Sequence, residues 1–151
     1  FEFEQMGTGV DGAQETWEMM EADGGQDVFG FGTTDGHWQF ARLVDTVPMQ
    51  ELAADQSDDW RQLGVSILHR LIIDSLIAQR YPNAKLSCRY VHRLDEVTAA
   101  QADKTCGLAC LVAPAGIEHV EQIATRHEKM PPKSTYFYPK LLSGLVFHPL
   151  E

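Results

Sequence analysis

The spacing of hydrophobic residues changes from segment to segment along this chain. Residues 1–5 alternate apolar and polar side chains, the period of a half-buried strand. From Ala13 onward the apolar residues recur at helical spacing, and this pattern ends at Asp23, Gly24 and Gly25. The chain is therefore predicted to begin with a strand followed by a helix.

Two strand-like runs, residues 28–32 and 38–44, come next. The residues between them include Asp35 and Gly36, and an Asp-Gly pair is a strong signal for a tight hairpin turn. These two runs are therefore expected to pair as antiparallel strands.

A long helix is predicted from Ser57, which offers a capping hydroxyl in front of two acidic residues. It is expected to end before Tyr81 and Pro82, because a proline disfavours helix in the residue before it. The apolar stripe of this helix consists of Trp60, Leu63, Ile67, Leu68, Leu71, Ile72 and Leu76.

The second half of the chain again alternates strand and helix patterns. We expect strands at 86–92 and 106–112, and the second of these should be central because it is apolar on both faces. Helices are expected at 95–102 and 114–126, and a last strand at 145–148. The inner face of the helix at 114–126 should carry Ile117, Val120, Ile123 and Ala124.

These elements predict an α+β fold with one mixed, largely antiparallel sheet, a β-hairpin and covering helices. The 151 residues suit a single compact domain with a core of its own. The chain begins without Met and directly on a strand pattern, so we expect it to be a fragment of a longer protein.

Charge is distributed unevenly within a net of −10. Residues 1–60 hold 14 acidic residues against one arginine, whereas residues 61–151 hold 11 Lys and Arg against 8 acids. This balance argues against nucleic acid as a partner and leaves room for a local anion site in the second half. No apolar run has membrane-spanning length, and three cysteines without framework spacing favour the cytoplasm.

A GxGxxG pattern is formed by Gly7, Gly9 and Gly12 between the first strand and the first helix. The strand before it is polar at alternate positions, and the next strand leads into a hairpin rather than a parallel crossover. We therefore favour a plain strand-to-helix turn over a dinucleotide site.

The remaining candidates for chemistry are weak. The Cys and His residues considered as ligands of a shared zinc ion lack CxxC spacing, and buried cysteines usually act as small hydrophobic residues. Two histidines near the helix at 114–126 are read as solvated surface. The residues concerned are Cys88, His92, Cys106 and Cys110 for zinc, and His119 and His127 for the surface. We name no cofactor and no catalytic residue.

The stretch 133–145, KSTYFYPKLLSGL, carries the densest mixture of polar and aromatic groups. Two lysines and several hydroxyls together suit a phosphate or carboxylate. The aromatic side chains equally suit packing in the core or against another domain. The candidate ligand or interdomain residues are Lys133, Ser134, Thr135, Tyr136, Tyr138 and Lys140.

The residues MPPKSTYFYPK at 130–140, followed by SGLV at 143–146, resemble the C-terminal signature of an uncharacterised family, domain of unknown function 1015. Residues 63–70 and the glycine-rich strand at 29–32 resemble two further stretches of that family. The chain departs from the family pattern at Gly64, Arg70 and Ala113-Pro114-Ala115, where Asp, Glu and an Asn-Pro-Thr loop are usual.

The resemblance implies a C-terminal domain whose relatives carry an additional N-terminal part. It suggests a binding or assembly role, in which the candidate residues contact a small anionic ligand or that N-terminal part. Genes of the family sometimes lie beside serine biosynthesis genes. This leaves open a phosphoryl-handling enzyme of small-molecule metabolism as an alternative, and a purely structural domain as another. Homo-oligomers are compatible with all three.

Overall fold

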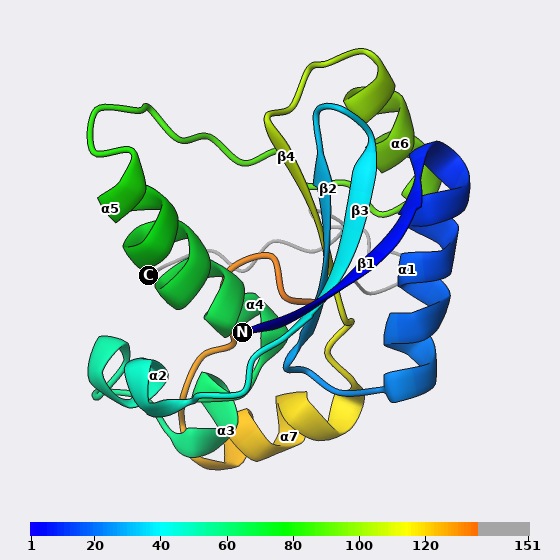
Figure 1. Ribbon diagram of the computed structural model, residues 1–151. Coiled ribbons are helices and arrows are strands. Elements are labelled where there is room, and N and C mark those ends of the chain that lie inside the picture. The colour runs from blue at the N-terminus through cyan, green and yellow to red at the C-terminus, as the bar shows by residue number, and fades with distance from the viewer. Residues whose placement is uncertain (136–151) are drawn as a thin grey trace, which may run out of the picture.

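Four antiparallel strands form one sheet, with helices on both of its faces, in a computed structural model that describes residues 1–135 (Figure 1). The strand order is β1-β3-β2-β4, and the α+β prediction is confirmed. The elements are β1 (Glu2–Thr8), α1 (Gly9–Asp23), β2 (Val28–Thr33), β3 (His37–Arg42), α2 (Val47–Leu52), α3 (Asp58–Arg61), α4 (Gly64–Ile67), η1 (Leu68–Ile77), α5 (Ala78–Arg80), α6 (Leu94–Ala102), β4 (Leu108–Val112) and α7 (Ile117–Thr125).

The predicted hairpin forms the centre of the sheet. Strands β2 and β3 pair from Val28 opposite Arg42 to Gly32 opposite Trp38. The turn between them closes with a hydrogen bond from the Gly36 N–H to the Thr33 carbonyl, at 3.0 Å. Gly36 has a φ of +87°, a conformation that glycine adopts at little cost, so the Asp-Gly signal reports this turn correctly.

One face of the sheet is covered by α1 and α6, which lie side by side (Figure 1). Helix α1 ends as predicted at Gly24, which has a φ of +73° and whose N–H bonds to the Met20 carbonyl. Its inner side packs into a core cluster with the sheet. The buried members are Ala13, Met20, Val28, Trp38, Phe40, Ala109 and Leu111.

The opposite face is covered by α2, α4 and η1, around a second cluster of Phe29, Ala41, Leu43, Met49, Ile67, Leu71 and Ile72. The predicted long helix occupies this position but is not continuous. Leu63 has extended backbone angles, φ −64° and ψ 133°, and separates α3 from α4. Beyond Ile67 the helix widens into a π-helix, in which the Ala78 N–H bonds to Ile73, five residues earlier. The hydrophobic stripe therefore predicts burial correctly as far as Ile72, with Leu68 partly buried, although the backbone changes its winding. At the end of the stripe the prediction is wrong, since Leu76 is 48% exposed.

Three other predictions are wrong. Residues 86–92 form no strand, because the segment must lead from η1 on one face to α6 on the other and does not run along the sheet. Strand β4 is not central: within residues 1–135 it has a neighbour on one side only. Its side chains do enter both clusters, so the apolar run indicates burial on two faces but not the number of neighbouring strands.

The prediction of the inner face for the helix at 114–126 is also wrong. Among the four apolar residues expected there, Ile123 alone is buried, and Ile117 is 62% exposed.

Helix α2 was not predicted, because the sequence around Pro48 reads as a loop. Pro48 is nevertheless well placed in a first helical turn. The predicted strand at 145–148 lies outside the described residues.

None of the helices within residues 1–135 combines the length and the apolar character that crossing a bilayer requires.

Candidate functional site

The start of the candidate stretch forms a tight turn. Pro131 and Ser134 are buried, and the Ser134 hydroxyl donates to the Pro131 carbonyl at 2.6 Å. Lys133 is exposed at the tip with a φ of +62°, which is uncommon for a residue with a side chain. Thr135 is also exposed, whereas Tyr136, Tyr138 and Lys140 lie outside the described residues. The structure thus gives Ser134 a place in the turn and leaves Lys133 and Thr135 open to a ligand or partner.

This turn is fastened to the start of α3. The Glu128 carboxylate accepts hydrogen bonds from the Ser57 N–H, at 2.7 Å, and from the Ser57 hydroxyl. The Trp60 indole N–H donates to the Lys129 carbonyl at 3.1 Å. Met130 packs against the cluster that contains Trp60, so residues 128–130 are held by both polar and apolar contacts.

The most cationic surface of the described chain lies elsewhere, between η1 and α6. Residues 75–94 contain no Asp or Glu but include Arg80, Lys85, Arg89 and Arg93. We call residues 75–94 the cationic segment. Residues 81–90 are all exposed. Arg93 pairs with Asp95. Within residues 1–135 no carboxylate pairs with the other three cations, so their charge faces solvent.

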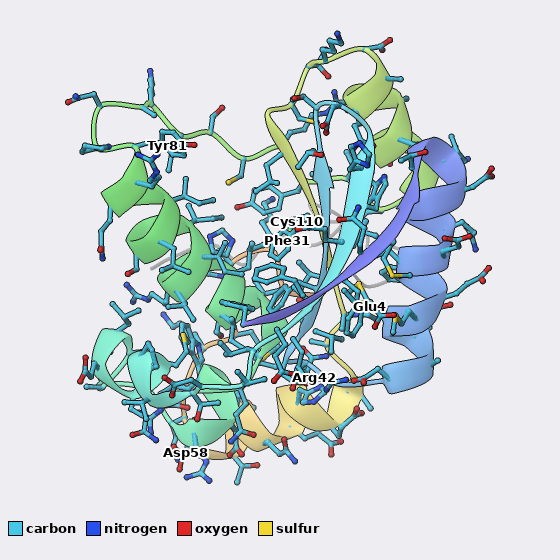
Figure 2. All side chains as sticks on the ribbon, in the orientation of Figure 1. Glu4, Phe31, Arg42, Asp58, Tyr81 and Cys110 are labelled. Atoms are coloured by element: carbon cyan, nitrogen blue, oxygen red, sulfur yellow. The ribbon has the colours of Figure 1, made fainter. Side chains whose placement is uncertain are left out.

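Aromatic side chains lie among these cations. The Arg80 guanidinium stands 5.6 Å from the centre of the Tyr81 ring, and Tyr81 projects from the end of α5 (Figure 2). Tyr90 contacts η1 instead: its hydroxyl is 3.3 Å from Nε2 of His69, and the two rings stack at 6.1 Å. Tyr90 therefore anchors an otherwise exposed segment to the π-helix, a form of helix often found at functional sites.

Burial changes the ionisation of Tyr90, within the segment, and of Cys110, on β4. It raises the pKa of the Tyr90 hydroxyl, with a further contribution from Cys88. It also raises the pKa of the Cys110 thiol to about 12, and Cys88 again adds to the effect. Cys110 and Phe31 lie together on the sheet face toward η1 (Figure 2). Both groups are held in their neutral form, which suits anchoring rather than acid-base chemistry.

The glycines of the GxGxxG pattern serve packing and turn formation. Gly9 has a φ of +62°, and its N–H donates to the Gly36 carbonyl at 2.8 Å. Gly12 lies against the backbone of Gly7, so the start of α1 is in direct contact with β1.

The cysteine and histidine candidates are not gathered in one place. Cys106 packs into the cluster under α1 and α6, whereas Cys110 packs into the cluster under η1, on the other face. Within the described residues no three His, Cys, Asp or Glu side chains are placed to hold a metal ion. His127 is exposed as predicted, but His119 is only 29% exposed and its Nδ1 accepts the Gly116 N–H at 2.9 Å.

The comparisons with known proteins add no relative: no family model, no curated protein and no solved structure matches the chain. The resemblance to domain of unknown function 1015 therefore remains a proposal.

The cationic segment gives no distinct signal when charge is summed over residues 61–151, so the sequence analysis does not single it out. A shorter window shows the signal, since residues 75–94 form a run of 20 positions without an acid in a chain with 22 acidic residues. The charge pattern does not reveal that the cations are exposed and unpaired. The alternation of residues 86–92 predicts a paired strand there instead.

Proposed function

We propose that this domain binds a small anionic ligand at the cationic segment. One observation carries the proposal: Arg80, Lys85 and Arg89 are exposed on an acid-free segment of a protein whose net charge is −10. Elsewhere in the described chain Arg126 pairs with Asp59 at 2.7 Å, and Arg61 pairs with Asp58. Cations without a carboxylate partner are available to a ligand that brings its own negative charge.

The chemistry of the segment favours a phosphate or carboxylate ligand. Guanidinium groups bind such oxygens in a two-pronged arrangement, and a lysine adds a mobile point charge. Tyr81 is 57% exposed next to Arg80 and supplies an apolar surface with a hydroxyl group. The segment is open to water, so the affinity should be modest and should fall with added salt.

The proposal keeps the earlier candidate residues in a second role. Lys133 and Thr135 are exposed on the turn that is fastened to α3, and they suit contact with an N-terminal part of the kind the family resemblance implies. The same resemblance supports phosphoryl transfer as an activity of a longer protein, in which fixed cations would stabilise developing negative charge. Such activity should appear as turnover in the longer protein and disappear after Lys133→Ala.

Calorimetry and thermal unfolding test the anion site. Titration with inorganic phosphate, sulfate and phosphoserine should release heat, and saturation at about 100 times Kd should add about 2.7 kcal/mol to the stability. The triple variant Arg80→Ala, Lys85→Ala and Arg89→Ala should lose this effect while keeping its fold, because exposed side chains contribute within about 0.5 kcal/mol.

Lys129→Ala is the matched control, since Lys129 is an exposed cation outside the segment. It should bind all three anions as the unmodified chain does. Equal loss in the triple variant and in the control, or absence of binding by any of the anions, would contradict the proposal. Tighter binding of a single-stranded oligonucleotide than of phosphoserine would overturn the assignment to a small ligand.

A further inference from the structure

A pocket of about 530 Å³ lies at the end of the molecule opposite the cationic segment. Its walls come from the connection between α1 and β2 and from α2, α3 and α7. Asp58 on this pocket and Tyr81 on the cationic segment lie at opposite ends of the view (Figure 2). The pocket therefore does not belong to the proposed anion site. Its volume falls in the range that small-molecule ligands occupy.

The floor of the pocket is apolar. Leu43, Met49 and Ile67 line it, and each also belongs to the core cluster under η1. Met49 and Ile67 are both 2% exposed, so the floor is part of the packed interior. A ligand resting on this floor would cover carbon atoms with one side and meet the polar walls with its edges.

The charged residues of the walls neutralise one another. The three carboxylates that line the pocket each have an arginine partner: Asp27 with Arg42, Asp58 with Arg61, and Asp59 with Arg126. Arg61 also donates to the carbonyls of Ala53 and Gln56, at 3.2 and 2.7 Å. Neither an anion nor a cation finds a free opposite charge among these groups.

Uncharged polar groups, by contrast, are free. Gln50 on α2, Gln62 after α3 and Gln122 on α7 all line the pocket, and none of their amides has a hydrogen-bond partner within residues 1–135. His119 adds a directed donor. Because its Nδ1 accepts the Gly116 N–H, the neutral ring carries its proton on Nε2.

We infer that this pocket binds an uncharged, polar small molecule bearing several hydroxyl or amide groups, such as a sugar or another polyol. Each side-chain amide offers both donors and an acceptor, and three amides from three helices can contact several such groups at once. Because the aspartates are already paired with arginines, the ligand needs no charge of its own. The apolar floor supports the carbon skeleton of the ligand. This inference is independent of the anion site.

Heteronuclear NMR of the side-chain amides tests the inference directly. Ribose, N-acetylglucosamine and myo-inositol serve as neutral probes at millimolar concentration. At least one of them should shift the resonances of Gln50, Gln62 and Gln122 in a saturable manner. The double variant Gln62→Leu, Gln122→Leu keeps the side-chain size and should weaken that binding at least about fivefold.

Gln14→Leu is the control, since Gln14 is exposed on α1 and its amide bonds to Glu18. It should bind the probe as the unmodified chain does. Should the double variant unfold, Gln50→Leu alone provides the same comparison. No shift of the three amides with any neutral probe, or unchanged affinity in the Leu variants, would overturn the inference.

Ribose 5-phosphate separates the two sites. If it shifts resonances of Arg80, Lys85 and Arg89 while ribose shifts none of the pocket amides, the anion site stands and the pocket inference fails. If ribose shifts the pocket amides and no anion affects the cationic segment, the pocket inference stands alone.

Discussion

Gly7 and Gly12 are in backbone contact across the junction between β1 and α1. A β-carbon built on Gly12 would lie 2.5 Å from the carbonyl oxygen of Gly7, too close for any real side chain. The contact is between backbone atoms, so no flexible side chain can move aside to relieve it. The glycine pattern that suggests a dinucleotide loop thus permits a helix to start directly against the strand.

Replacing Gly12 by Ala should therefore destabilise the fold. Overpacking of this kind costs about 1–3 kcal/mol, whereas alanine gains up to about 1 kcal/mol over glycine inside a helix. We expect the free energy of unfolding to fall by roughly 1–2 kcal/mol in urea denaturation. Gly107→Ala is the control, because nothing lies within 4 Å of its β-carbon position. A similar loss in both variants would refute the packing explanation.

Gln26 ties three parts of the chain together. Its side-chain oxygen accepts the Gly64 N–H at 3.0 Å, and its amide nitrogen donates to the Pro114 carbonyl at 2.9 Å. Gln26→Leu leaves both backbone groups without this partner, so stability should fall by about 2 kcal/mol. Gln79→Leu loses one surface hydrogen bond, to Ser75, and should cost much less. Denaturation curves that show equal losses would argue against the linking role.

Glu128 should control how firmly the turn around Lys133 is held. Glu128→Ala removes both hydrogen bonds to Ser57, and hydrogen bonds to a charged group contribute about 1.5–3 kcal/mol each. We expect trypsin to cleave after Lys129 faster in this variant, because the segment detaches from α3 more often. Glu121→Ala, on the exposed side of α7, is the control and should leave the cleavage rate unchanged.

Acid should weaken the contact between α1 and β3. The hydrogen bond from Arg42 is the main cause that holds the pKa of Asp23 below its usual value of 3.8. The carboxylate therefore stabilises the fold above pH 3.8, and this contribution disappears as the pH falls through the lower folded pKa. Asp23→Asn should be less stable near neutral pH and should show a shallower loss of stability in acid.

The partner variant provides the check on this pair. Arg42→Met should show the same shallower acid dependence in urea denaturation, and the double variant should add little beyond either single change. Additive effects of the two changes would show that Asp23 and Arg42 act independently.

The thiols should differ in reactivity. Cys88 is exposed, whereas burial keeps the Cys110 pKa at about 12, so Cys110 holds its proton at pH values where alkylation is usually done. Iodoacetamide should label Cys88 first in the native protein, and Cys110 only after denaturation, as peptide mass spectrometry would show. Cys88→Ser should remove the rapid phase, and equal labelling of Cys110 in the native state would contradict the burial.

Much of the fold follows from local patterns. The Asp35-Gly36 turn, the glycine that ends α1 and the Ser57 cap of α3 each depend on neighbouring residues, and all three form as predicted. The helix stripe from Trp60 to Ile72 was likewise readable, because burial follows the spacing of apolar residues even where the helix becomes a π-helix.

The sites depended on more distant contacts. Residues 86–92 alternate like a strand, but a strand also needs a neighbouring strand, and the path from one face of the sheet to the other gives this segment none. Likewise, Gln50, Gln62 and Gln122 have no pattern in common and meet only because α2, α3 and α7 surround one pocket.

The sequence by itself therefore determined the α+β class, the hairpin, the buried stripe and the uneven charge, since these depend on residue type and short-range spacing. Only the tertiary structure decided that β4 has one neighbour in the described sheet, that the acid-free segment is exposed, and that three aspartates are already neutralised by Arg42, Arg61 and Arg126. Whether a charge is free or paired depends on groups far away in the chain, and spacing along the sequence carries no record of them.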